Sequence, residues 1–564
     1  MWLLQRVIPN DLLIWLAHPL QNANNFTYCA IGLATVLGGG IFSTLIRYVL
    51  VKRELAQKRK EKLSKCQNAL KQLESDVLGT LSSSEREKII KLDLSQLIIK
   101  LQAEEITPSQ VLSAYQSKAI EVNKQLNCLV EPITEASEQA KAVEQLPEKG
   151  PLYGVPISLK DNYSLKGYDC TLGCARFVNL PYSKDAVIVQ VLKKQGAIPF
   201  VKTNVPQTMI SWETTNPMFG MTRNPYDTTR GVGGSSGGET ALIAGGGSIL
   251  GFGSDVGGSI RIPANMCGVY GLKPTDMRIS NKGMAPILKG QTCVCSSYGP
   301  LGKDVDSLVI AMKAMCVPEM SLLDPTIPYK PFNMEVFESK RKLKIGFYLQ
   351  DGFFHAVPAM ERAVLEAKQI LESRGHEVME WNYPNIGLKG MLTFVISLSG
   401  DGGEELFELV HGDAVDSSLK NTIRLLSIPK FVRKFLGFVL NFIEFKESVT
   451  NDWIDKGLDA VICPGFACPA LPLNTALLAT GSVSYTSLYN VLNYPTGSLP
   501  VTKVISEDNE KMKNYPVKDL WHRAVKKFMR GSEGLPVNVQ VAALPWQEEL
   551  VLRIMKEIQT DLKK

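Results

Sequence analysis

The 564-residue sequence has few of the residues that carry imidazole and metal chemistry. Its five histidines all lie outside glycine-rich or otherwise site-like segments: His18, His355, His376, His411 and His522. The eleven cysteines are spread thinly, form no CxxC pairs at metal-ligand spacing and are odd in number. Cys170 and Cys174 come closest to a ligand pair, but no histidine lies near them. We therefore expect reduced, buried or free thiols, and neither a metal nor another cofactor.

An excess of charge of one sign is also lacking. The net charge of +6 is small for this length, so composition gives no reason to expect nucleic acid as a partner. With 45% hydrophobic and 21% charged residues, the chain is of ordinary globular type and long enough to bury a large core. Length alone fits several domains or one large α/β domain, and no internal repeat or low-complexity tract divides the chain.

One long apolar run is present near the N-terminus. Residues 28–46 carry no charge and are long enough to cross a bilayer as a helix. A basic cluster follows, made up of Arg47, Lys52, Arg53, Lys58, Arg59, Lys60, Lys62 and Lys65. The positive-inside rule then predicts a transmembrane helix over 28–50, a short non-cytosolic segment over 1–27 and a cytosolic remainder. Because three consecutive glycines weaken this helix, a buried core helix is the alternative.

The remainder divides into a linker and a body. Residues 51–91 predict a basic helical linker, and residues 92–564 a catalytic domain. Thr107-Pro108-Ser109-Gln110 is a capping box with proline at the first helical position, and apolar residues follow at helical spacing. From Leu152 onward, strand-like runs alternate with a helical one, which predicts an α/β fold with a large mixed, twisted sheet covered by helices.

A second amphipathic segment spans residues 429–445. Phe431, Phe435, Val439 and Ile443 recur every four residues, and the basic residues lie off that stripe. Such a helix fits a membrane interface and fits an ordinary core helix equally well.

The stretch from Gly231 to Thr275 concentrates glycines around the serines Ser235, Ser236 and Ser259. Glycine permits positive φ and lets other groups approach its amides closely, so this region can form an acyl-transfer site. Gly233 to Gly237 match the G-x-S-x-G pattern, but no buried strand precedes them and no histidine is nearby, so a Ser-His-Asp triad has no support here. The alternative is a glycine-rich turn without chemistry.

A serine nucleophile needs a base, and Lys160 in GVPISLKDN follows an apolar run that we expect to be buried. Burial disfavours the charged form of a lysine and lets it accept a proton. The alternative for Lys160 is an ordinary solvated lysine.

Four motifs in order, GVPISLKDN, GGSSGGE, GSDVGGSIRIPA and GLKPT, together resemble the amidase signature family. The likeness extends from about Leu92 to the closing ALPWQEELVLRIMKEI, and more loosely to the N-terminal apolar run. Within the family, the chain resembles the membrane-bound members that hydrolyse fatty-acid amides.

The resemblance implies a Ser-Ser-Lys triad, with Ser259 as nucleophile, Ser235 as a bridge with a cis backbone, and Lys160 as base. Ser236 would support this cluster. The backbone amides of Val256, Gly257, Gly258 and Ser259 would form the oxyanion hole, and Asp255 would orient their loop. Met209 matches a substrate-channel position, while Ile210 and Trp212 stand where the family tends to have aromatic residues.

The implied function is membrane-bound hydrolysis of fatty-acid primary amides and N-acylethanolamines, with a lipid amide and a membrane as partners. The resemblance also implies a homodimer, and a location in the endoplasmic reticulum or another endomembrane. The segment after 429–445 is shorter than the family pattern, so we expect an incomplete membrane cap. Two alternatives stay open: an amidase acting on a small or peptidyl amide, and an inactive lipid-amide-binding protein.

Overall fold

A computed structural model describes residues 23–285, 293–426, 431–432 and 442–563. Within these residues, eleven strands form one mixed sheet in the order β1-β3-β2-β6-β8-β7-β12-β13-β11-β9-β10. Their bounds, in that order, are Leu129–Pro132, Ile198–Thr203, Pro156–Lys160, Leu250–Asp255, Ser297–Gly302, Tyr270–Lys273, Thr496–Lys503, Pro536–Ala543, Ala460–Pro464, Lys344–Phe347 and Glu377–Glu380. Two short strands, β4 (Thr215–Asn216) and β5 (Gly220–Met221), pair separately. The predicted mixed sheet is confirmed.

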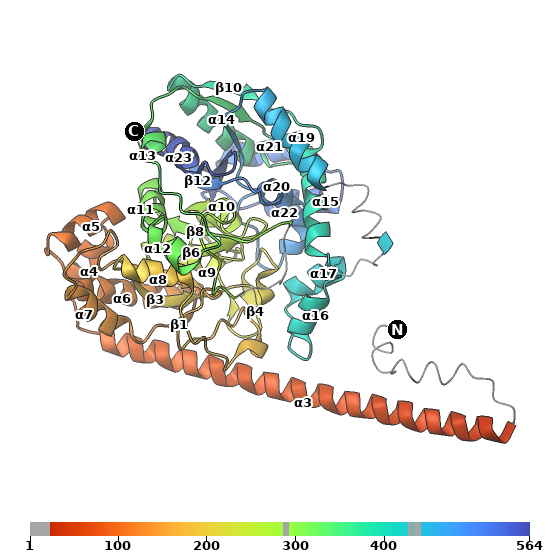
Figure 1. The fold of residues 1–564 in the computed structure, drawn as a ribbon. Coiled ribbons are helices and arrows are strands. Elements are labelled where there is room, and N and C mark those ends of the chain that lie inside the picture. The colour runs from red at the N-terminus through yellow and green to blue at the C-terminus, as the bar shows by residue number, and fades with distance from the viewer. Residues whose placement is uncertain (1–22, 286–292, 427–430, 433–441, 564) are drawn as a thin grey trace.

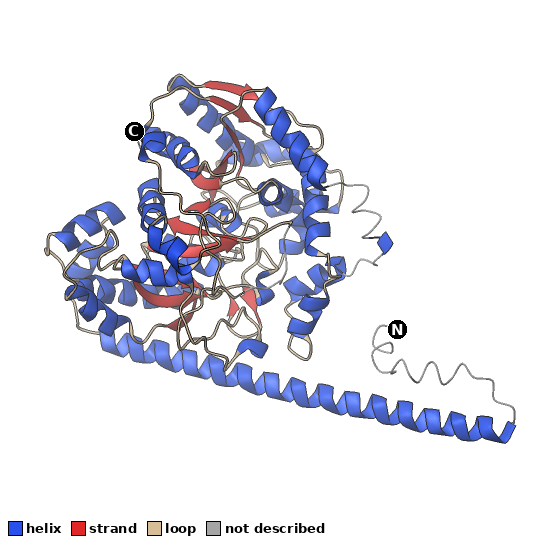
Figure 2. Cartoon of the chain, viewed as in Figure 1, coloured by secondary structure: helices blue, strands red, loops and turns tan. Residues whose placement is uncertain are grey.

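Helices surround this sheet (Figure 2). The α-helices are α3 (Ala23–Val77), α4 (Ser83–Ile90), α5 (Leu94–Gln102), α6 (Pro108–Leu126), α7 (Ala136–Glu144), α8 (Val187–Lys194), α9 (Gly237–Ala244), α10 (Arg261–Cys267), α11 (Val305–Met315), α12 (Pro318–Leu323), α13 (Met334–Glu338), α14 (Pro358–Ser373), α15 (Ile386–Leu398), α16 (Glu404–Val410), α17 (Ser417–Leu426), α19 (Phe442–Asp455), α20 (Ser484–Val491), α21 (Ser506–Lys511), α22 (Leu520–Phe528) and α23 (Glu548–Leu562). Short 3-10 helices are η1 (Ala175–Phe177), η2 (Gln207–Met209), η3 (Ala476–Val483) and η4 (Met512–Asn514).

The sheet centre is buried on both faces. Every residue of β2, β3 and β6 is buried, so these strands are continuous runs without an exposed alternating face. Strand β2 is parallel to both β3 and β6. The capping box predicted at Thr107 is confirmed, because its side chain accepts from the Gln110 amide and α6 begins at Pro108.

Helix α3 includes the segment in which we predicted a transmembrane helix. It is one continuous helix along one side of the body, and its N-terminal part extends beyond the body (Figure 1). Among the described residues, no helix combines the length and the apolar character needed to span a bilayer. The structure therefore gives the predicted transmembrane helix over 28–50 no support, and the segment 1–22 lies outside the described residues.

The C-terminal part of α3 packs on the body, although the sequence predicted a linker. Lys62 is buried and forms ion pairs with Glu131 in β1 (2.7 Å) and Asp169 (3.0 Å). Arg59 pairs with Asp413 at 3.1 Å. The predicted amphipathic segment 429–445 falls largely on residues 427–430 and 433–441, which are outside the described residues.

Candidate active site

The carboxyl ends of neighbouring strands bring the motif residues together. Strand β2 ends at Lys160 and the parallel strand β6 ends at Asp255, so these two residues lie at the same edge of the sheet. The loop after β6 carries Ser259 and leads into α10. Ser235 and Ser236 directly precede α9, so the four sequence motifs contribute to one region.

Lys160 is fully buried, and its Nζ contacts Ser235. The Nζ atom donates to Ser235 Oγ at 2.7 Å and to Ser254 Oγ at 2.9 Å. Burial lowers the pKa of the Lys160 ammonium to about 7, against the opposing effect of the nearby carboxyl groups of Asp255 and Glu239. A substantial fraction of Lys160 is therefore neutral near pH 7, as a base requires.

Ser235 and Ser259 lie on adjacent loops. The peptide bond between Gly234 and Ser235 is cis, as the resemblance implied. The Ser236 N–H donates to the carbonyl oxygen of Ser259 at 3.0 Å, which joins the two loops. Ser235 is buried, whereas Ser259 is partly exposed and lines a cavity. Among the described hydrogen bonds, none joins the hydroxyl groups of Ser235 and Ser259 directly.

Ser236 belongs to the same cluster without contacting Lys160 in the described hydrogen bonds. Its hydroxyl donates to the carbonyl oxygen of Ser254 at 3.3 Å. Ser254 itself accepts from Lys160 and, at 3.2 Å, from the side-chain amide of Asn162. Ser254 therefore links the ends of β2 and β6 behind Ser235.

Asp255 organises the loop that precedes Ser259. Its carboxylate accepts from the amides of Gly258 (2.7 Å) and Ile260 (3.1 Å) and from Arg261 Nε (3.0 Å). Although burial opposes ionisation, the Arg261 guanidinium holds the pKa of Asp255 well below its usual range. Asp255 is thus a permanently charged orienting group and unsuited to be a second base.

The backbone amides of this loop divide into two groups. The Gly258 amide, which we predicted to face an oxyanion, is occupied by Asp255. In the described part of the chain, no protein acceptor takes the amides of Val256, Gly257 or Ser259. Those three amides are therefore available to a bound ligand, and two of their residues, Val256 and Gly257, line the cavity with Ser259.

Both glycines of the loop lie in close contact with neighbouring helices. A Cβ at Gly258, where φ is +124°, would lie 2.4 Å from Thr486 Oγ1. A Cβ at Gly257 would lie 2.4 Å from Cζ of Phe394, which lines the cavity. Glycine here lets the loop pass close to α15 and α20.

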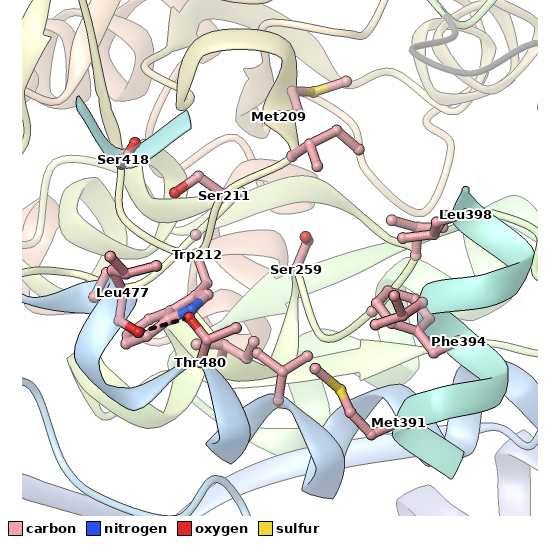
Figure 3. Close-up of a pocket in the computed structure, with 18 residues that line it drawn as sticks. Met209, Ser211, Trp212, Ser259, Met391, Phe394, Leu398, Ser418, Leu477 and Thr480 are labelled. Carbon is pink, nitrogen blue, oxygen red and sulfur yellow. Dashed lines mark hydrogen bonds between the residues drawn. The ribbon is translucent and has the colours of Figure 1, made fainter. Parts of the chain in front are cut away.

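The cavity is mostly apolar, with Ser259 on its wall (Figure 3). Met209, Ile210 and Trp212, the three predicted channel residues, all line it. Other side chains of the wall come from segments far away in sequence, among them Phe394 and Leu398, which lie across the cavity from Leu477 in Figure 3. Further lining residues are Ser211, Ile262, Met391, Val395, Ser418, Ala476, Thr480 and Val483.

The four histidines in the described residues have contacts away from this cluster. His376 contacts Glu557 and His522 contacts Asp519. The rings of His355 and His411 pack against His522 and Tyr48. No described histidine partners the serines, so the Ser-His-Asp alternative gains nothing from the structure.

Some residues of the site were not identified from the sequence. Glu239 lies within the GGSSGGE motif, and its position in the first turn of a helix beginning at the serines could have indicated that it faces the same cluster. The cavity-lining residues of α15 and η3 could not be identified from the sequence, because the pattern of an apolar helix does not show which part of the protein the helix contacts.

Comparison with known proteins places these features in context. The family model described as Amidase matches residues 110–552. The chain is 44% identical to fatty-acid amide hydrolase 1 of Sus scrofa, covering 84% of this chain and 86% of that protein. It is 36% identical to fatty acid amide hydrolase 1 of Caenorhabditis elegans, covering 90% and 93%. A solved structure of a fatty acid amide hydrolase superposes with a TM-score of 0.76 at 25% identity, covering 92% of this chain and 95% of that one.

Proposed function

Since the chain belongs to the amidase signature family, we propose that it hydrolyses fatty-acid amides through a Ser-Ser-Lys triad of Ser259, Ser235 and Lys160. The observation that carries this proposal is the 2.7 Å contact between the buried Lys160 Nζ and Ser235 Oγ, behind an apolar cavity lined by Ser259. Both similar relatives are named for the same activity.

In this mechanism, the serines replace imidazole as the proton path. Neutral Lys160 accepts a proton from Ser235, and Ser235 accepts the proton of Ser259 as Ser259 Oγ attacks the amide carbonyl carbon. The proton then returns along the same path to the amide nitrogen, and the C–N bond breaks to leave an acyl-enzyme. The oxygen of a water molecule then attacks the acyl carbon and its proton passes to Ser235 and Lys160. The bond between the acyl carbon and Ser259 Oγ breaks, the proton returns to Ser259 Oγ, and the fatty acid is released.

The oxyanion of the tetrahedral intermediate would accept hydrogen bonds from the free amides of the loop at Val256, Gly257 and Ser259. Each such donor typically contributes about 10²–10³ in rate. Asp255 would act indirectly, since it holds Gly258 and Arg261 and thereby fixes the direction of the neighbouring amides.

The cavity supports a long acyl chain as the preferred group. Its walls consist mainly of aliphatic and aromatic side chains, including Met209, Ile210, Trp212, Phe394 and Leu398. Each buried methylene group contributes roughly 0.8 kcal/mol, so a chain that fills the cavity supplies much of the binding free energy.

The decisive experiment is hydrolysis by the purified, detergent-solubilised chain of amides from acetamide to oleamide, with anandamide as an N-acylethanolamine. We expect kcat/KM to rise with chain length. A preference for acetamide would instead indicate an amidase of another substrate class.

A fluorophosphonate probe tests the nucleophile directly. Labelling should persist in Ser236→Ala and vanish in Ser259→Ala, with amide hydrolysis of Ser259→Ala reduced by about 10³-fold or more. Absence of labelling in a folded wild-type preparation would favour a lipid-amide-binding protein without activity.

The membrane part of the proposal rests on the sequence of residues 28–46 and the basic residues after it. We propose that this part of α3 anchors the chain once in an endoplasmic reticulum or other endomembrane, with the body on the cytosolic side. Extraction by detergent but not by alkaline carbonate is the expected result, and release by carbonate would refute the anchor. The homodimer implied by the resemblance is tested by light scattering of the detergent-solubilised chain.

A further inference from the structure

Glu239 is a fully buried carboxyl group behind the proposed triad, and the mechanism above does not use it. It lies in the first turn of α9, three residues after Ser236. Its two oxygens accept hydrogen bonds from different strands, Oε2 from Ser158 Oγ at 2.6 Å and Oε1 from Thr203 Oγ1 at 2.8 Å. The carboxyl group thus ties α9 to β2 and β3.

The strand geometry places the two hydrogen-bond donors of Glu239, Ser158 and Thr203, next to Lys160 in the sheet. Ser158 and Lys160 are two residues apart in β2 and therefore project from the same face. Thr203 is the partner of Lys160 in the parallel β2–β3 register. Glycine at position 251 makes room for the group, because a Cβ there would lie 2.2 Å from Glu239 Oε2.

We propose, as a step that rests on the proposed function, that Glu239 is a positioning residue that acts through Lys160. Its carboxyl group holds helix α9, which directly follows Ser235 and Ser236, against the strand that ends at Lys160. Its charge, when present, stabilises the Lys160 ammonium and so opposes the neutral amine that accepts the proton of Ser235.

The ionisable groups near Glu239 and Lys160 determine which charges change there as the pH is varied. Burial raises the pKa of Glu239 to about 8, and hydrogen bonds from Ser158 and Thr203 oppose that effect. Burial also raises the pKa of the Cys128 thiol and of the Tyr163 phenol, so both stay neutral near pH 7. Asp255 faces Lys160 from β6 and stays charged. Among the groups that interact with this pair, Glu239 and Lys160 are therefore the ones whose charge changes near neutral pH. Burial also lowers the pKa of Lys273 to about 7, but Lys273 faces Arg261 and Asp255.

The first test is the rate of fluorophosphonate labelling of Ser259 between pH 5 and 10. Labelling rises with pH as Lys160 loses its proton. In Glu239→Gln, the carboxylate of Asp255 still stabilises the ammonium but that of Glu239 no longer does, so we expect the rising limb of the pH profile to move about half to one pH unit lower. Thr203→Val removes a donor that stabilises the Glu239 carboxylate and should move the limb in the same direction by less.

Glu549→Gln is the matched control, since Glu549 is also buried but pairs with Arg278. The rising limb of the labelling pH profile of Glu549→Gln should coincide with that of the wild type. An unchanged limb in both Glu239→Gln and Thr203→Val, a uniform loss of rate without a shift, or an upward shift would each overturn the proposal. If Glu239→Gln does not fold, Glu239→Asp and Thr203→Val decide.

A second measurement does not depend on activity. An acid whose folded pKa is raised binds more protons when folded, so it makes stability fall as pH rises from about 4.3 to its folded pKa. Between pH 5 and 7, the unfolding equilibrium constant of the wild type should increase relative to that of Glu239→Gln by about tenfold per pH unit. Parallel curves would refute the role of Glu239, even if the wild type hydrolyses no long-chain amide.

Discussion

At the scale of residues, the site separates buried charges by their partners. Asp255 is buried but remains charged because Arg261 pairs with it, whereas Lys160 is buried and contacts hydroxyl and carbonyl groups. The same degree of burial therefore produces a fixed anion at Asp255 and an amine at Lys160 that loses its proton near neutral pH, beside one cluster of serines. A reaction that needs a charged Asp255 and a Lys160 able to accept a proton therefore depends on the different partners of these two residues.

Lys160→Ala should reduce amide hydrolysis by about 10²–10⁴-fold and shift the active pH range upward. Without the amine, Ser259 loses its proton only at higher hydroxide concentration. The measurement is kcat/KM from pH 5 to 10, with the exposed Lys166→Ala as the control that leaves the profile in place. An unchanged pH profile in Lys160→Ala would remove this residue from the mechanism.

Gly258→Ala should lower both stability and activity. The position has positive φ, and the added Cβ would meet Thr486 at 2.4 Å, so strain and a clash combine to cost about 2–4 kcal/mol. Gly79→Ala is the matched control, because Gly79 also has positive φ but has no atom within 4 Å of the added Cβ. Denaturant unfolding should show a clearly smaller loss for Gly79→Ala, and equal losses would contradict the clash.

The sequence was sufficient to locate Lys160, Ser235 and Ser259 because each lies in a short motif of unusual composition. The structure brings Lys160 into contact with Ser235 and places Ser259 on the adjacent loop, while the catalytic roles of all three stay proposals. The occupied Gly258 amide was not predictable, since the acceptor of an amide depends on loop geometry. The hydrogen bonds of Glu239 depend on the register of β2 and β3, which cannot be deduced from residue types alone.

At the scale of elements, α3 shows the limit of reasoning from charge patterns. The run of basic and acidic residues predicts a basic helical linker over 51–91, and α3 continues through 51–77 of that range. Lys62 is nevertheless buried, because Glu131 and Asp169 lie opposite it on the body. Partners so distant in sequence leave no local pattern.

Lys62→Met should destabilise the chain by about 3–5 kcal/mol, because it leaves two carboxylates without their cation. Lys65→Met, three residues further on the exposed side of α3, is the control and should change the unfolding free energy by less than about 0.5 kcal/mol. Equal effects of the two substitutions in denaturant unfolding would show that α3 docks without this ion pair.

At the scale of the whole molecule, the class of the fold followed from the alternation of strand-like and helical runs, but the strand order did not. Neighbouring strands β7 and β12 are more than 200 residues apart in the chain, and β6 pairs directly with β8 although β7 comes between them in the sequence. The strand order is set by packing of the complete core. The cavity walls also depend on tertiary packing, since α15 and η3 come close to Ser259 only in the folded chain.

A chain that begins at Ser43 should retain hydrolysis of a short, water-soluble amide within about twofold. The ion pairs of α3 with the body, at Arg59 and Lys62, remain in it. The same truncation should move the chain out of the membrane fraction if residues 28–46 are its anchor. Continued membrane association after truncation would place the attachment elsewhere in the chain.

The docking of α3 has a mechanical consequence. Arg59 holds Asp413, and the following residues exchange hydrogen bonds with Gln207, which begins the short helix that ends at the cavity residue Met209. Displacement of the N-terminal end of α3 would therefore act, through Arg59, Asp413 and Gln207, on the wall of the cavity at Met209.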